Sequence, residues 1–174
     1  MAKMLSLALV SFVFTAGFAT SAFAGRDGEQ GICMDGSTRM QSYNNEQVLS
    51  WKKSTPNAWH GRGFVNGAVS EVVDSTPGHF RFVVKIGPKS SDLLEVVYNS
   101  AFGALPELRP GTPVAICGDF INAFERSGRY PPSPAGAIIH WVHGSNSKRH
   151  EDGFVAVNGT IFGQDGDARR GGRR

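Results

Sequence analysis

Residues 60–86 read HGRGFVNGAVSEVVDSTPGHFRFVVKI, two runs of alternating apolar and polar residues on either side of a short polar segment. Alternation with a period of two predicts β-strands with one buried face, over 60–73 and 79–86. The segment 74–78, DSTPG, has the residue types of a hairpin loop. The side chains that we expect on the buried faces are Val65, Gly67, Val69 and Val73 in the first strand and Phe80, Phe82, Val84 and Ile86 in the second.

Gly67 lies inside the first strand, where a glycine indicates a bulge or a bend. A bend there lets one long strand pass through both halves of a small barrel. Further strands are predicted over 92–98, 114–120, 136–143 and 154–162, with a connector over 99–107 that can hold a helical turn and a type I′ turn signal at 158–159. This order predicts an all-β fold, a small five- to six-stranded OB-like barrel, with a small β-sandwich as the alternative.

A short N-terminal helix is expected before the barrel, over 46–53, with Asn44 or Asn45 as its cap. The length of the chain suits one domain with a core of its own. The organisation that follows is a signal peptide over 1–24, an N-terminal arm and short helix over 25–58, the barrel over 59–163 and a disordered Gly/Arg tail over 164–174.

Residues 1–24 have the layout of a secretory signal peptide. Lys3 precedes a mostly apolar stretch, Leu5–Phe18, and Ala22-Phe23-Ala24 forms a small-x-small cleavage site. The apolar stretch is too short for a membrane span of about 20 residues, although an uncleaved N-terminal anchor is the alternative. We therefore expect a periplasmic or secreted protein with no transmembrane segment after cleavage.

The two cysteines, Cys33 and Cys117, can form a disulfide in an oxidising compartment. The alternative is that Cys117, inside the apolar run 114–120, is a buried free thiol. We expect the disulfide, and two cysteines alone make no metal site.

The basic character of the chain, with a pI of about 9.1, is concentrated at its end. The tail carries four arginines against two aspartates, and outside this tail and the leader the basic and acidic residues are equal in number. A neutral barrel makes nucleic acid an unlikely partner for it. The tail is either a solvated end or a contact for anionic surfaces.

Three of the five histidines, His140, His143 and His150, lie in and just after the predicted strand 136–143. Together with Asp152 they offer the ligand types that zinc or copper takes, and His79 could join them from a neighbouring strand. Residues an odd number apart point to opposite faces of a strand, so His140 and His143 diverge unless the strand bulges or ends near Val142. The alternative is that His140 bonds to a backbone carbonyl in the core while the other two order the loop.

These motifs resemble an uncharacterised bacterial family of secreted proteins, domain of unknown function 3465, over about residues 60–162. The resemblance implies a common fold and a common site built on the histidines, and it supplies no activity. The residues that carry it are His79-Phe80-Arg81-Phe82, Val97-Tyr98-Asn99, Gly111 before Val114, Gly118-Asp119-Phe120, Ile139-His140-Trp141-Val142-His143, His150, Gly153 and Asn158-Gly159.

OB barrels bind oligomers on the outer face of their second and third strands. The residues expected on that face are His79, Arg81 and Lys85, with Asn99 at its edge and Trp141 near it. One aromatic ring with a few cations suits an anionic ligand, a glycan or a peptide, and is sparse for single-stranded nucleic acid. The alternative is an ordinary solvated strand face.

A histidine beside Glu151 or Asp152 is also a candidate general base, and Arg81 could stabilise a phosphate-like anion. This combination would make a metal-dependent hydrolase, similar to a phosphodiesterase or nuclease. No nucleophile motif accompanies it. We therefore expect a binding or accessory protein of unknown ligand, with the hydrolase as the alternative.

Overall fold

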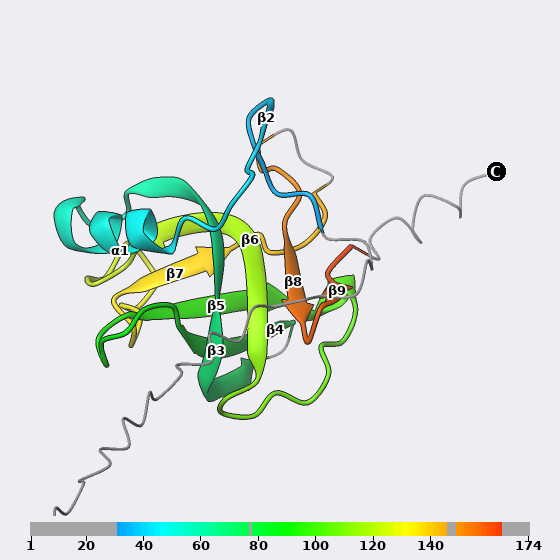
Figure 1. The fold of residues 1–174 in the computed structure, drawn as a ribbon. Helices are drawn as coiled ribbons and strands as arrows, with labels where there is room; N and C mark the ends of the chain where they lie inside the picture. The colour runs from blue at the N-terminus through cyan, green and yellow to red at the C-terminus, as the bar shows by residue number, and fades with distance from the viewer. Residues whose placement is uncertain (1–30, 77, 146–148, 165–174) are drawn as a thin grey trace, which may run out of the picture.

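The computed structural model describes residues 31–76, 78–145 and 149–164, without the side chains of 74–76 (Figure 1). The predicted signal peptide and nearly all of the predicted tail lie outside the described residues. None of the helices in the described part of the chain has the length and hydropathy needed to span a membrane.

Five strands close into a barrel in the order β3-β4-β5-β7-β6, because β6 also pairs with β3. Four of the five neighbouring pairs are antiparallel, and β5 runs parallel to β7. This is an OB-like barrel, so the predicted fold class is confirmed. The strands are β3 His60–Thr76, β4 His79–Lys85, β5 Leu93–Asn99, β6 Pro113–Asn122 and β7 Ala137–His140, and a hairpin of β8 Phe154–Val157 and β9 Thr160–Phe162 extends the sheet from β6.

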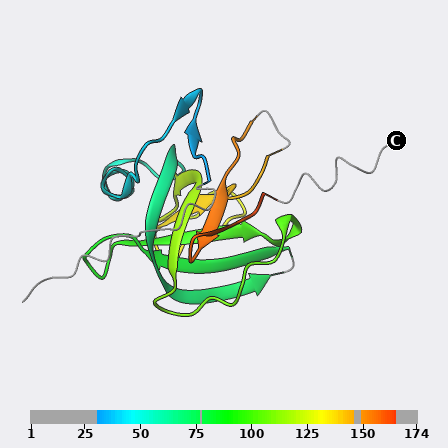
Figure 2. The ribbon, with the colours of Figure 1, turned by 45° about the vertical axis from the view of Figure 1, so that its right-hand side comes forward.

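Strand β3 serves both walls of the barrel, as Figure 2 shows. Its first half, His60–Ala68, pairs with β6, and from Ala68 onward it pairs with β4. The change of partner occurs at Ala68, next to Gly67, where a Cβ atom would lie 2.2 Å from the carbonyl oxygen of Lys85. A side chain there would collide with β4, so this close approach requires a glycine, while the register shifts of β3 lie further along, after Val69 and Val72.

The buried face of β3 ends earlier than the alternation predicted. Val65 and Val69 are buried, but register shifts follow Val69 and Val72, and Val73 is 37% exposed. The shifts rotate the strand, so Val73 does not join the core. The core itself is built on the interior faces of the barrel, with Phe82, Leu94, Val96, Tyr98, Ile116, Phe120 and Ile139 fully buried.

The N-terminal helix α1, Asn45–Ser54, packs Val48 into this core. Asn44 is the N-cap residue, one of the two predicted, but its side chain makes no capping hydrogen bond to the helix. Asn44 instead accepts a hydrogen bond from the backbone N–H of Phe64, and Asn45 accepts one from that of Asn66. Both asparagines therefore dock the helix on β3.

The arm before α1 contains a small hairpin of β1, Met34–Asp35, and β2, Thr38–Arg39. A disulfide joins Cys33 in this arm to Cys117 in β6, as predicted. The connector after β5 holds a single helical turn, η1 Ser100–Phe102, also as predicted. The expected turn between β8 and β9 has positive φ at both central residues, Asn158 and Gly159.

Candidate functional site

Four aromatic side chains form a row in which each ring lies beside the next. We call this row the imidazole face, and it consists of His79, His140, Trp141 and His150. The ring centroids of His79 and His140 are 6.2 Å apart, and those of His140 and Trp141 are 4.4 Å apart. The rings of Trp141 and His150 are stacked, 3.6 Å apart and 10° from parallel. β4 begins where β5 and β7 end, which brings His79 beside His140.

Trp141 has a left-handed backbone with φ of 49°, which is uncommon for a residue with a bulky side chain. This conformation ends β7 at His140, three residues earlier than predicted. Gly153 packs closely behind it, since a Cβ there would lie 2.2 Å from the Trp141 carbonyl oxygen and 2.5 Å from that of Cys117. The fold therefore holds the tryptophan in a conformation that costs free energy, as is frequent at binding sites.

His150 is held by Asp119, which is held in turn by a buried arginine. The Nδ1 atom of His150 lies 3.3 Å from Oδ2 of Asp119, whose Oδ1 accepts a hydrogen bond of 2.6 Å from Arg62 Nη1. Arg62 also donates to the carbonyl oxygens of Met34 and Asp152. A carboxylate that pairs with an arginine is ionised and can only accept, so Nδ1 of His150 carries the proton and Nε2 can accept one.

His143 is not part of the imidazole face, unlike the three histidines named above. Its ring is buried and stacks on Phe102 of η1, with centroids 3.8 Å apart. Its Nδ1 atom lies 2.7 Å from the carbonyl oxygen of Gly144, which can only accept, so this nitrogen is the donor. His143 therefore anchors the chain beyond β7 to η1.

Two histidines at this edge, His140 and His143, are uncharged at neutral pH because burial lowers their pKa. Burial, followed by the neighbouring imidazoles, lowers the pKa of His140 to about 4. Burial also lowers the pKa of His143, against the hydrogen bond to Gly144 that raises it. Desolvation disfavours the imidazolium form, so these two rings stay neutral above mildly acidic pH.

Within residues 31–76, 78–145 and 149–164, no group of three or more His, Cys, Asp or Glu side chains is arranged to hold a metal ion. The predicted zinc or copper ligands do not converge on one point, so metal binding stays a prediction. Asp152 accepts a hydrogen bond from the backbone of Ser145 and closes the intervening loop. The predicted zinc or copper ligands were His140, His143, His150 and Asp152.

The predicted binding residues on the outer face of β4 and β5 are partly occupied. Arg81 forms an ion pair with Glu95, which is fully buried. Asn99 accepts a hydrogen bond from the backbone of Ala101 and so begins η1, while Lys85 is exposed at the far end of β4. Only His79 and Trp141 of the predicted set belong to the imidazole face.

Sequence reasoning missed Arg62 and Asp119 as members of the site. Asp119 lies in the apolar run of β6, and a carboxylate in such a run indicates a buried partner. The sequence contained that signal. It did not identify the partner, because Arg62 is 57 residues away and contacts Asp119 only in the folded barrel.

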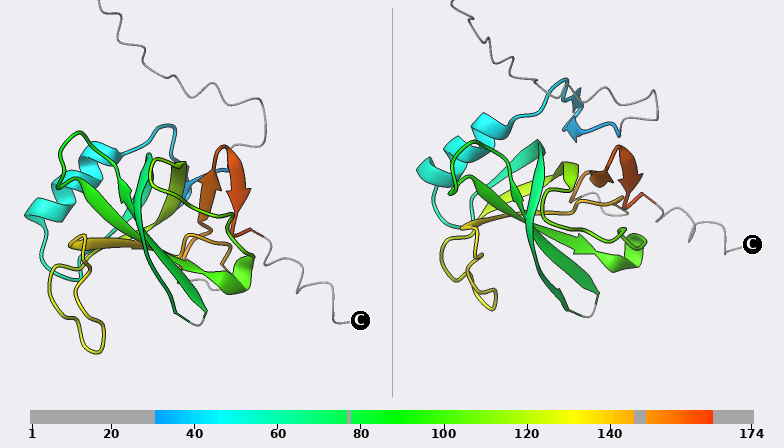
Figure 3. Two further views of the ribbon diagram at one scale, coloured as in Figure 1. Left: turned by 90° about the horizontal axis from the view of Figure 1, so that it is seen from below. Right: turned by 60° about the horizontal axis from the view of Figure 1, so that its bottom comes forward.

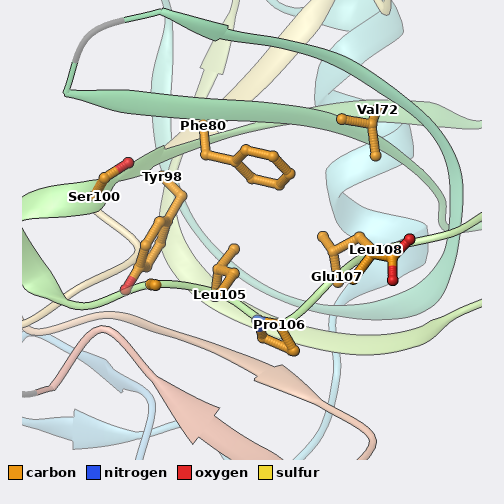
Figure 4. Close-up of a pocket in the computed structure, with 9 residues that line it drawn as sticks. Val72, Phe80, Tyr98, Ser100, Leu105, Pro106, Glu107 and Leu108 are labelled. Carbon is orange, nitrogen blue, oxygen red and sulfur yellow. The ribbon is translucent and has the colours of Figure 1, made fainter.

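An apolar cavity of about 440 Å³ lies near η1, under the curved part of β3 (Figure 4). The segment 104–108 crosses this end of the barrel without forming a helix and leaves the cavity half open. Its lining is mostly apolar, with Ser100 and Glu107 as the polar members, and contains no histidine, so it differs in character from the imidazole face. The lining residues are Val72, Phe80, Tyr98, Ser100, Ala104, Leu105, Pro106, Glu107 and Leu108.

Comparison of the chain with protein-family models, with curated proteins and with solved structures gave no match. The resemblance to the uncharacterised secreted family is therefore still a prediction.

Proposed function

We propose that the chain is a binding or accessory protein of the periplasm or extracellular space, and that it takes a glycan on the imidazole face. The observation that carries the proposal is the stacked pair of Trp141 and His150, 3.6 Å apart at the open end of β7. Flat aromatic rings with a few placed polar atoms are typical of ligand sites, and Nε2 of His150 provides an acceptor beside the rings. The Cys33–Cys117 disulfide agrees with an oxidising compartment.

Charge favours a glycan over the other predicted ligands. Arg62 and Arg81 are each paired with a carboxylate, and His140 is neutral at pH 7. An anionic ligand or an acidic peptide would need an unpaired cation here. Sugar hydroxyl groups need only acceptors, donors and a flat apolar surface.

Tryptophan fluorescence during titration with chito-, cello- and malto-oligosaccharides tests this proposal. We expect a saturable change that is lost in Trp141→Asn, a substitution that tolerates the left-handed backbone, and in His150→Ala. His60→Ala is the matched control, since His60 is exposed and outside the face. No saturable change with any of the sugars contradicts the proposal, and a response to alginate oligomers alone would favour an anionic ligand.

The hydrolase alternative has its own supporting contact, which is the pairing of His150 with Asp119. A carboxylate that orients an imidazole through Nδ1 leaves Nε2 as a general base for a water molecule. Hydrolysis of bis(p-nitrophenyl) phosphate, lost in Asp119→Asn, would favour this reading. Stoichiometric zinc or copper in the purified protein, lost in His140→Ala/His143→Ala, would indicate that the hydrolase depends on a metal.

A further inference from the structure

The loop between β6 and β7, residues 123–136, exposes two aromatic side chains. Phe124 is 47% exposed and Tyr130 is 62% exposed, whereas most other aromatic residues in the described part of the chain pack in or against the core. The loop projects from the barrel in both views of Figure 3. Two neighbouring exposed rings on one projecting loop form apolar surface that a contact outside the chain can cover.

The same loop presents two arginines that form no ion pair with any described residue. Arg126 and Arg129 are exposed, and the guanidinium of Arg129 lies over the ring of Tyr130, 5.2 Å from its centroid. This differs from the barrel, where Arg62 and Arg81 are paired with carboxylates. Glu125 is the only carboxylate of the loop, so its net charge is positive.

The loop is held in place from both sides. The backbone N–H of Glu125 donates to the side chain of Asn57, and the Asn57 amide donates back to the Glu125 carbonyl oxygen. At the tip, Ser127 and Tyr130 exchange two backbone hydrogen bonds, and Ala123 N–H donates to Gly136 O at the base. The backbone that carries these rings and guanidinium groups is thus already fixed before binding, which favours affinity.

We infer that this loop is a docking surface for an anionic lipid bilayer. Phe124 and Tyr130 have the apolar rings that partition into the headgroup boundary, and arginine forms bidentate hydrogen bonds with lipid phosphate. A glycan site would instead place hydrogen-bonding groups around each ring, whereas the amide of Asn57 beside the loop is already bonded to the backbone of Glu125. The surface is independent of the proposed function, because the loop leads into the first residue of β7, whereas the imidazole face is built around its last residue, His140.

Cosedimentation of the exported form, from residue 25, with phosphatidylcholine vesicles containing phosphatidylglycerol tests the inference. We expect binding that falls with salt, and that Arg126→Gln/Arg129→Gln lowers on the order of tenfold. Phe124→Ala/Tyr130→Ala should lower it by a similar factor. Vesicles of phosphatidylcholine alone should bind far less.

Three controls make the result specific. Lys85→Gln/Lys89→Gln removes two exposed cations from elsewhere on the barrel and should leave binding unchanged. Repeating all binding measurements in a chain with glutamine in place of the four tail arginines removes the contribution of the tail to vesicle binding. His150→Ala, which tests the imidazole face, should bind vesicles as the parent does. No binding to either vesicle, equal loss in the lysine control, or binding of soluble alginate but not of vesicles would each overturn the inference.

Discussion

The two ends of β7 differ in how the fold treats polar groups. At its last residue, His140, the imidazole rings of His79 and His140 lie with centroids 6.2 Å apart, and nearby Arg62 is buried in a pair with Asp119. Before its first residue, the loop 123–136 leaves two arginines and two rings in water. Burial makes the first region sensitive to pH, because it shifts pKa values, whereas exposure makes the second sensitive to salt.

The largest expected loss of stability comes from opening the disulfide that ties the arm to the buried end. Cys33→Ala/Cys117→Ala removes a link between residues 84 apart in the chain. The chain-entropy treatment gives a loss of up to about 4–5 kcal/mol in the free energy of unfolding. Urea denaturation of the parent, with and without reductant, and of the double variant measures it. An unchanged midpoint would show that the arm contributes little to the fold.

Arg62 should distinguish the two ends most directly. Arg62→Met leaves Asp119 without its cation, and breaking a buried pair from one side costs about 3–5 kcal/mol. Arg129→Met, the same change in the exposed loop, should stay within about 0.5 kcal/mol. Equal losses of unfolding free energy in the two variants, measured by urea denaturation at pH 7, would remove the distinction.

His140 gives the buried end a pH dependence of smaller size. Its pKa is lowered from 6.5 to about 4, so the unfolded chain binds the proton more readily than the folded one. The stabilising contribution is complete above about pH 6.5 and is lost as the pH falls toward 4. At pH 5 the loss from this group is about 2 kcal/mol. The difference in unfolding free energy between pH 7 and pH 5 should be smaller by that amount in His140→Gln than in the parent. An identical pH dependence in the two proteins would contradict the burial argument.

Local pattern was sufficient for the strands and for most turns. The alternation in His79–Ile86 predicted which side chains face the core, and Asn158-Gly159 predicted the last turn, because both depend on neighbours in the chain. Prediction failed where a tertiary contact decided the outcome. Val73 left the core through register shifts, and β7 ended at His140 because Gly153 packs against the Trp141 carbonyl.

The barrel, its disulfide and the histidine-rich end follow from residue types and their spacing, which any reader of the chain can see. The pairing within the site does not, because it joins segments that are distant in sequence. Arg62, Asp119 and His150 come from β3, β6 and the loop after β7, and burial then decides their charge. Desolvation and pairing are properties of the folded surroundings, so only the tertiary structure could determine which cations are neutralised and which remain in water.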